Sequence, residues 1–562
     1  MTSPASRPAD AHPEEPASQD VWIQDDRIVA PSKDLLASQE IDASGCWVMP
    51  CGIDMHTHVG GGKVTLARML LRDQLPPWAI ARGSSQTNDP AESDFLPSAF
   101  VTAERYLRMG YGTCLEPAII PCNARSAHAE MADLRGIDTG GYCLLGNDDA
   151  LLQLMAAETP QPVINAYVAD QVRSTQTLGV KVVNAGGISA FKFNGRKLDV
   201  DENHPRYGIT PGTIIRQLAR AVDEIGLAHP LHVHASNLGV PGNIASTLAT
   251  IKAASGHRIH ITHAQFHSYD NTGPYKMASA AAELARVVNE NPNVSIDVGQ
   301  IQFGRTVTIS ADSMHQFENR LHAKPRKSIV LDIECEAGCG VVPFRYQRRE
   351  YVHSLQWAIG LELFLMIEDP SRVYLTTDHP NGAPFTAYPH LMRLLGDRSF
   401  RNTALAEIHP EAAAASSLAG MDREYGVEEL ATMTRSGPAK VLGLADRGHL
   451  RPGGLADVVV YRRSNDLQAS FTSPLWVIRR GKIMIDPDGP RMEAAIPAQM
   501  HQCLIANPPI DAWDLKQARK QVASMDVDSH QHPISRDEML EVMNTECVIA
   551  SSRQESMEGN RT

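Results

Sequence analysis

Two pairs of histidines that belong to apolar, strand-like runs are each separated by a single residue. They are His56-Thr-His58 and His232-Val-His234. Because side chains alternate between the two faces of a β-strand, both members of such a pair point the same way and can share one metal ion. Histidine is the commonest metal ligand in proteins, although one isolated pair is more often structural. The recurrence of the pattern favours a metal site.

Three further residues with metal or acid–base chemistry follow apolar runs, namely Lys192, His263 and Asp378. A charged lysine has three donors and no lone pair, so it cannot bind a metal as it stands. Burial favours the neutral amine, which is nucleophilic and can add CO2 to become a carbamate. A carbamate has two oxygens and can bridge two ions. Two Zn²⁺ with the carbamate, Asp378 and a hydroxide would leave a small positive charge, which suits polarisation of a carbonyl group.

The elements that must position these residues are short apolar runs that alternate with helical patterns. We predict eight strands, at residues 47–58, 112–118, 141–146, 187–193, 230–235, 258–265, 294–300 and 372–378. Alternation of strands and helices is typical of a parallel barrel, whose active site lies at the carboxyl ends of its strands. The sequence therefore predicts an α/β protein with a (β/α)8 TIM-type barrel.

Strand patterns near both chain ends predict a second, smaller domain. Residues 21–29, 455–461 and 476–484 are rich in β-branched and aromatic residues and are bounded by turn residues, so we expect a small β-sandwich domain built from both ends. The predicted parts are 1–50 for the first part of the sandwich, 51–437 for the barrel with an insertion at 301–371, 438–499 for the second part, and 500–562 for a C-terminal extension. Helical patterns are expected at 355–367 in the insertion and at 513–525 in the extension.

The composition excludes several classes of protein. With 43% hydrophobic and 21% charged residues among 562, the chain is globular rather than disordered. Lysine and arginine number 52 and aspartate and glutamate 65, and the net charge of −13 argues against nucleic acid as a partner. The 9 cysteines form no Cys-x-x-Cys pair, and no apolar run is long enough to span a membrane. We expect a cytoplasmic protein without a membrane partner.

Two stretches resemble the amidohydrolase superfamily: Val48-Met-Pro-Cys-Gly-Ile-Asp-Met-His-Thr-His58 and Arg451-Pro-Gly-Gly-Leu-Ala-Asp-Val-Val459. Members of this superfamily carry a barrel and a small sheet domain made from both chain ends. The resemblance covers about residues 21–482. It implies a binuclear zinc site, in which the first zinc binds His56, His58 and Asp378, the second binds His234 and His263, and carboxylated Lys192 bridges the two. Whether His232 replaces His234 as a ligand stays open.

Two longer stretches are similar to a subgroup of that superfamily. His232-Val-His-Ala-Ser-Asn-Leu-Gly-Val-Pro-Gly-Asn243 and His260-Ile-Thr-His-Ala-Gln-Phe-His-Ser-Tyr269 resemble the A subunits of formylmethanofuran dehydrogenase and of the bacterial formyltransferase/hydrolase complex. The resemblance implies metal-dependent hydrolysis of a linear amide, the formamide of N-formylmethanofuran, to formate and the free amine. Methanofuran would be the substrate carrier. Partners would be the other subunits of the complex, including a formyltransferase.

The resemblance also implies roles for single residues. Asp378 would take a proton from water and deliver it to the leaving nitrogen. Asn237, His267 and Tyr269 follow predicted strands and are candidates for substrate binding. Each could equally form hydrogen bonds to the backbone of a loop. Substrates of this kind have acidic tails, so Arg345, Arg348 and Arg349 in the insertion are candidates for a basic entrance; a solvated basic face is the plainer interpretation.

Several alternative functions would be compatible with the same residues. The lack of the Lys/Glu enrichment of hyperthermophile proteins favours the bacterial hydrolase complex. A tungsten or molybdenum formylmethanofuran dehydrogenase would carry its redox chemistry in a separate polypeptide, so that chemistry would leave no trace here. A free-standing cyclic amidase or aminoacylase would use the same ligands. A metal-free structural scaffold of the same fold is the fourth alternative.

Overall fold

The central element of the protein is a barrel of parallel strands. The structure is a computed structural model that describes residues 20–32, 36–71, 99–193, 195, 197–310, 340–491, 500–523 and 533–552. The barrel strands are β4 (Gly52–Asp54), β5 (Tyr111–Ile119), β6 (Asp138–Leu144), β7 (Gly179–Val183), β8 (Leu231–His234), β9 (Ile259–Ile261), β12 (Val294–Asp297) and β15 (Val373–Tyr374). Each pairs in parallel with the next. A bridge between Thr57 and His379 joins the first strand to the last, and the predicted TIM-type barrel is confirmed.

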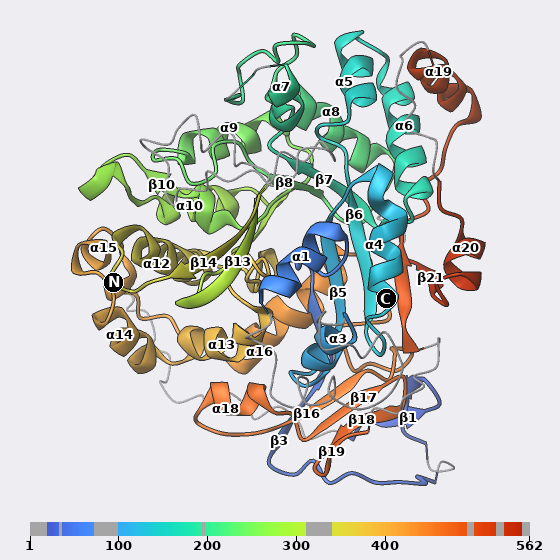
Figure 1. Ribbon diagram of the computed structural model, residues 1–562. Helices are drawn as coiled ribbons and strands as arrows, with labels where there is room; N and C mark the ends of the chain where they lie inside the picture. Colours follow the sequence, from blue (N-terminus) through green and yellow to red (C-terminus); the bar gives the residue numbers. More distant parts are fainter. Residues whose placement is uncertain are drawn as a thin grey trace, which may run out of the picture.

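Helices surround the barrel and bury its outer surface (Figure 1). The main ones are α3 (Ala99–Leu107), α4 (Ala124–Met131), α5 (Asp149–Ala156), α6 (Gln161–Ser174), α8 (Pro211–Glu224), α9 (Ile244–Ala253), α10 (Ala281–Glu290), α12 (Tyr351–Met366) and α13 (Tyr388–Gly396). Helix α8 begins at Pro211, which occupies the first helical position, and the Thr210 hydroxyl caps it by accepting a hydrogen bond from the Thr213 amide. The helix expected at 355–367 is α12. Shorter helices follow α13, namely α14 (Arg398–Ala406), α15 (Pro410–Ala414), α16 (Val427–Ala431), α17 (Gly437–Val441) and α18 (Leu467–Thr472).

The fourth barrel strand differs from the predicted one. Residues 187–193, predicted as this strand, instead form helix α7 (Gly187–Lys192), and the strand is β7, a few residues earlier. Gly186, whose φ of 69° lies in the left-handed region, separates the two elements. The side-chain oxygen of Asn147 accepts hydrogen bonds from the amides of Ile188 and Ser189, at 3.0 and 3.1 Å. These bonds satisfy amides in the first turn of α7 and favour a helix over a strand.

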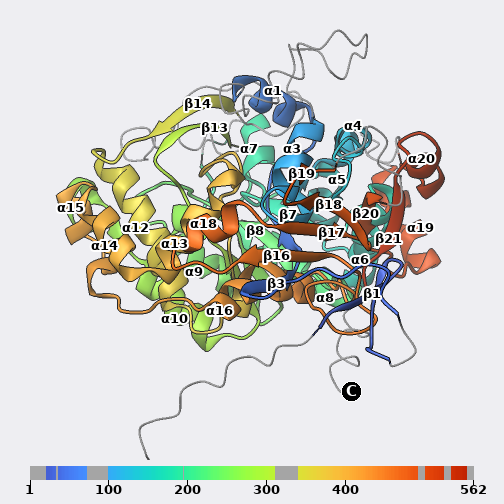
Figure 2. The same cartoon turned by 90° about the horizontal axis from the view of Figure 1, so that it is seen from below.

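A five-stranded antiparallel sheet lies below the barrel, in the order β19-β18-β17-β16-β3. Its strands are β3 (Cys46–Pro50), β16 (Val458–Arg462), β17 (Trp476–Arg479), β18 (Lys482–Asp486) and β19 (Gly489–Pro490). Figure 2 shows β3, from the N-terminal region, beside β16 from the C-terminal region, which confirms a sheet built from both ends. The strand predicted at 47–58 is thus two strands, β3 in this sheet and β4 in the barrel. A separate hairpin, β1 (Trp22–Gln24) and β2 (Arg27–Val29), joins the sheet region through a bridge from Arg27 to Leu455.

The C-terminal extension continues the barrel sheet. Strand β20 (Gln502–Ile505) pairs in parallel with β6, and β21 (Glu546–Ile549) pairs in parallel with β20. The helix expected at 513–525 is α19 (Ala512–Val522), which packs against α6. A second helix, α20 (Arg536–Glu541), precedes β21. The described part of the extension therefore adds two strands beside the first residues of β6.

A hairpin from the predicted insertion lies over the barrel mouth. Its strands are β13 (Gly304–Ser310) and β14 (Gly340–Tyr346), and residues 311–339 of the insertion lie outside the described residues. The hairpin packs against α1 (Gly62–Leu70) through a small apolar cluster that includes Ala67, Val307 and Val341. In the described part of the chain, no helix has both the length and the apolar character that a bilayer crossing needs.

Candidate active site

The carboxyl ends of the first and last barrel strands bring two predicted histidines to one carboxylate. The Nε2 atom of His56 lies 3.0 Å from Oδ1 of Asp378, and Nε2 of His58 lies 3.4 Å from the same oxygen. His263 joins them, since one ligand atom each from His56, His263 and Asp378 all lie within 4.8 Å of one another. The structure therefore gathers all three residues that the sequence assigns to the first metal.

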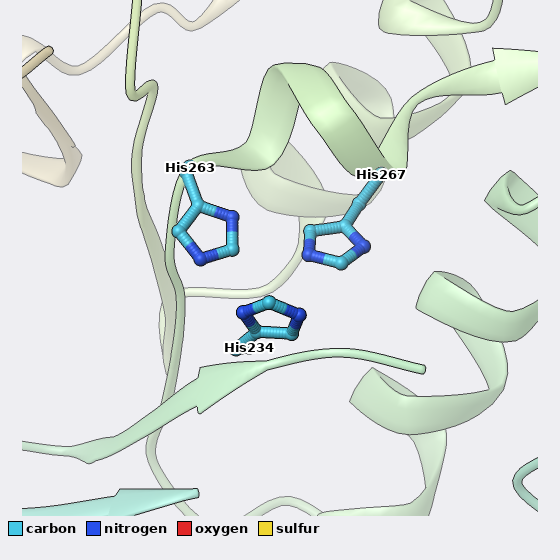
Figure 3. A group of neighbouring side chains, drawn as sticks. All are labelled: His234, His263 and His267. Atoms are coloured by element: carbon cyan, nitrogen blue, oxygen red, sulfur yellow. The ribbon is translucent and has the colours of Figure 1, made fainter. Parts of the chain in front are cut away.

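A second group of donors consists of three imidazoles. Ligand atoms of His234, His263 and His267 lie within 4.8 Å of one another, and all three residues are buried. Figure 3 shows His234 at the end of β8, with His263 and His267 on the turn that faces it. His263 belongs to both groups, so the two donor sets are contiguous. His267, predicted as a substrate-binding residue, thus lies beside both predicted ligands of the second metal.

A third group lies deeper in the barrel and contains His56, His232 and Asp297. Nε2 of His232 is 2.9 Å from Nδ1 of His56, and Nδ1 of His232 is 2.9 Å from Nε2 of His229. His232 therefore contacts the far side of His56, whereas His234 joins the imidazole group at the mouth. Sequence reasoning missed Asp297, although a carboxylate inside the apolar strand predicted at 294–300 was an available signal.

The structure corrects the choice of lysine. Lys192 lies on α7 with its side chain 28% exposed, and its Nζ is 2.6 Å from Oδ2 of Asp149. It is not brought to the donor groups. Lys181 lies in β7, is only 2% exposed, and is paired in register with His232. Burial lowers the pKa of Lys181 to about 7, even though the carboxylates of Asp297 and Asp378 act in the opposite direction. The signal in the sequence was a lysine inside a β-branched run, Gly179-Val-Lys-Val-Val183.

Glu116, at the end of β5, holds His58 in place and was also missed. Its Oε1 is 2.9 Å from Nδ1 of His58, and its Oε2 accepts from the amides of Val59 and Gly60 at 2.7 and 3.1 Å. A carboxylate on the far nitrogen of a histidine ligand fixes the orientation of its ring. Burial by itself lowers the pKa of His58, but Glu116 and Asp378 raise it to about 9. A metal that binds His58 must therefore displace a proton.

Asp378 is kept ionised and is tightly positioned. Burial acts to raise the pKa of Asp378, but the neighbouring imidazoles, His56 foremost, hold it well below its usual range. The side-chain amide of Asn381 donates to Oδ1 of Asp378 at 3.0 Å. The oxygen of the same amide accepts from the Ile309 amide at 2.6 Å, so the β13–β14 hairpin is tied to the loop that carries Asp378.

Two predicted substrate residues are held by other partners. The Asn237 side chain donates to the Ser246 hydroxyl at 2.9 Å. The Tyr269 hydroxyl is fully buried and accepts from the Gln356 side chain at 2.7 Å. Neither residue belongs to the three donor groups. A role for them in substrate binding remains a prediction.

The family follows from a comparison with known proteins. The family model described as the amidohydrolase family matches residues 39–484, which include the whole barrel and most of the small sheet. This chain belongs to the amidohydrolase family.

Relatives of this amidohydrolase are similar over most of their length. It is 44% identical to the A subunit of the formyltransferase/hydrolase complex Fhc of Methylorubrum extorquens over 472 residues, which cover 83% of this chain and 85% of the relative. It is 36% identical to protein FwdA of Methanocaldococcus jannaschii over 485 residues, 83% of this chain and 84% of the relative. Among solved structures, a chain of the FhcABCD complex from M. extorquens with methylofuran matches with a TM-score of 0.85 and 41% identity, covering 94% of this chain and 96% of that chain.

The donor chemistry of the amidohydrolase site fits divalent metal ions. Imidazole nitrogens and carboxylate oxygens are the zinc ligands of catalytic sites. The Nδ1 atom of His263 is buried and has no hydrogen-bond partner among the residues that the structure describes. A buried polar atom without a partner is unfavourable unless something else binds it.

Proposed function

We propose that this amidohydrolase uses two zinc ions to hydrolyse the formamide of an N-formylated methanofuran-type carrier to formate and the free amine. The observation that carries the proposal is the 44% identity to the A subunit of Fhc over most of both chains. The related complex was solved with methylofuran, which supports a carrier of that class. The buried imidazoles and carboxylates at the barrel mouth supply the donors that such a hydrolase needs.

We assign the first ion to His56, His58 and Asp378, and the second to His234 and His263. Lys181 replaces Lys192 as the residue that would bridge them. It is buried beside β8, and the negative charges of Asp297 and Asp378 act on its amine. Its neutral amine would add CO2, forming an N–C bond and releasing one proton. When bound, ions of this kind polarise a carbonyl group and make water nucleophilic near neutral pH.

The chain's own groups move the proton. Asp378 is ionised and can accept a proton from the attacking water, whose oxygen forms a bond to the formyl carbon. The C–N bond then breaks, and Asp378 delivers the proton to the leaving nitrogen. Asn381 keeps the Asp378 carboxylate oriented, and Glu116 does the same for the His58 ring.

We further propose that the chain works as the A subunit of a complex that includes a formyltransferase, which would supply the formylated carrier. The dehydrogenase, the free amidase and the metal-free scaffold each predict different companions or a different metal content. Purification of the tagged chain from its source should recover formyltransferase activity together with zinc. Recovery of tungsten or molybdenum would instead support the dehydrogenase, and a chain recovered alone would support the free amidase.

The reaction itself is tested with the zinc-loaded full-length chain. We expect it to release formate from an N-formyl aminomethylfuran carrier, followed by NMR, and to leave the N-acetyl compound largely intact. Formate should fall to background in the Asp378→Asn variant. Turnover of dihydropyrimidine rings at a comparable rate, without formate release, would contradict the proposal and favour the cyclic amidase.

A further inference from the structure

We infer that His267 is a third imidazole ligand of the second ion, beside His234 and His263. The inference rests on the proposed function, because it takes a metal pair at the barrel mouth as its starting point. The resemblance to the superfamily implies only His234, His263 and a modified lysine at this position. His267 adds a ligand that would hold the ion without the lysine.

The mutual placement of the three rings is the first observation. The ring centroids of His234 and His263 are 4.5 Å apart, and each lies 5.2 Å from the centroid of His267. One nitrogen of each ring lies within 4.8 Å of the other two, and all three residues are buried. In Figure 3 the rings gather around one space between the end of β8 and the facing turn. One ion in that space could contact all three.

The local backbone explains why His263 and His267 face the same way. The 3-10 helix η4 (Ala264–His267) begins directly after His263. A 3-10 helix has three residues per turn, so little more than one turn separates His267 from His263, and their rings lie nearly parallel, with an interplanar angle of 28°. His263 has a left-handed φ of 36°, which turns the chain from β9 into this short helix. The two imidazoles therefore leave the turn side by side, opposite His234.

The turn that carries His267 is fixed from outside by two side chains of the loop and helix after β8. The Asn243 amide donates to the Phe266 carbonyl at 2.7 Å and accepts from the Tyr269 amide at 3.0 Å. The Thr247 hydroxyl donates to the carbonyl of His267 itself at 2.8 Å. The backbone on both sides of His267 is thus held in place by the protein. Such support is what keeps a ligand set in its binding geometry.

Three imidazoles form a complete set of protein ligands for a catalytic zinc ion. The ion at this position should then persist when the bridging lysine is removed, as should the ion at His56, His58 and Asp378, which also has three protein ligands. At saturating zinc, neither ion should therefore be lost with Lys181. If His267 takes no part, the second ion has only two protein ligands and is lost with the bridge.

Zinc titration of the chelator-treated full-length chain tests the inference. The wild type should bind two equivalents tightly. Loss of a residue that merely supports a ligand weakens binding by about 10- to 100-fold, so His267→Gln should weaken one of the two equivalents by more than about 100-fold. His390→Gln is the matched control, because His390 is a half-buried histidine on α13 that pairs with Gln468, and it should leave both equivalents unchanged. Circular dichroism checks that each variant is folded.

A second measurement does not depend on how the His267 variant folds. At saturating zinc, Lys181→Ala should retain both zinc ions, and X-ray absorption should count between two and three imidazoles per ion on average. A single zinc ion with two imidazoles in that sample, or unchanged zinc affinity of folded His267→Gln, would overturn the inference while the proposed function stands. A wild-type chain that takes up no zinc would overturn both.

Discussion

Buried charges lie at both ends of the barrel, but they have different partners. At the amino end, Asp138 lies 2.8, 3.2 and 2.9 Å from Arg447, Arg479 and Arg480. At the carboxyl end, Asp378 faces imidazoles instead. Arginine stays charged at any pH that a protein experiences, whereas an imidazole can give up a proton and offer a lone pair. The amino end is therefore a permanent ion network, and the carboxyl end is a set of donors that can exchange protons for metal.

The amino-end network also fastens two parts of the fold together. Arg479, the last residue of β17, forms an ion pair with Asp457 and donates to the Gly136 carbonyl at 3.0 Å. It therefore links the small sheet to the start of β6, where Asp138 lies. The comparison teaches that burial and charge alone do not mark an active site. Changes at the two ends should produce different defects, in stability at the amino end and in metal content and turnover at the carboxyl end.

The largest contrast is expected between the two lysines. Lys181→Ala should bind zinc more weakly and lose at least about 100-fold in turnover, because a ligand contributes no less than the residues that support it. Addition of zinc with a small carboxylic acid should restore part of both. Lys192→Ala is the control and should keep metal and rate, since its partner is Asp149. Elemental analysis measures the zinc content of each variant, and a formate assay measures its turnover. Loss of zinc and turnover in Lys192→Ala but not in Lys181→Ala would instead identify Lys192 as the bridging lysine.

The second contrast concerns two carboxylates near the barrel mouth. Asp378→Asn should lower turnover by about 100- to 10,000-fold, the usual contribution of general acid–base catalysis, because an amide cannot carry the proton. Asp149→Asn removes a carboxylate that pairs with Lys192 and should change the rate little. A loss of less than about tenfold for Asp378→Asn would remove Asp378 from proton transfer.

At the amino end, Asp138→Asn should lower the free energy of unfolding by about 3–5 kcal/mol, the effect of breaking a buried ion pair. Zinc bound per folded molecule should not change. Burial raises the pKa of Asp138, but the three arginines overcome this and lower it well below its ordinary value. Its stabilisation is therefore complete above about pH 4, the pKa of an unfolded aspartate, and is lost as the pH falls further.

Urea unfolding at pH 7 and pH 3 measures this effect, and the difference between wild type and Asp138→Asn should shrink at pH 3. Glu290→Gln breaks an exposed pair with Arg286 and should lower stability by no more than about 1 kcal/mol. Loss of zinc from folded Asp138→Asn would show that the two ends are not separate.

The smallest effect is expected at the predicted basic entrance. Arg345 lies on β14 directly opposite Arg305 on β13, and Arg348 is 2.9 Å from Glu407. Exposed charge pairs contribute about 0.2–1 kcal/mol each, so replacing Arg345, Arg348 and Arg349 by glutamine should raise KM several-fold for a carrier with an acidic tail. The effect should fade with salt and be absent for a tail-less formamide. Arg286→Gln is the control, and an equal response of both substrates would place the entrance elsewhere.

The sequence predicted the barrel, the sheet from both ends and the histidine donors because these depend on local patterns. The alternation in His56-Thr-His58 and the position of Asp378 after an apolar run are visible without any partner. Lys181 was missed because the fourth strand was predicted at 187–193, which contains Lys192, and only the pairing of β7 with β8 shows that Lys181 is buried in the barrel. Glu116 and Asn381 act through side-chain contacts between distant elements, which no local pattern encodes.

We expect the carboxyl end of the barrel to hold two metal ions bridged by carboxylated Lys181. A crystal structure of the zinc-loaded chain, grown with bicarbonate and measured at the zinc absorption edge, would show the ions and the bridge together. Two anomalous peaks should appear among His56, His58, His234, His263 and Asp378, with extra density for a carboxylate on the Lys181 nitrogen. A single peak, or an unmodified Lys181 that points away from the metal, would rule out the bridged pair.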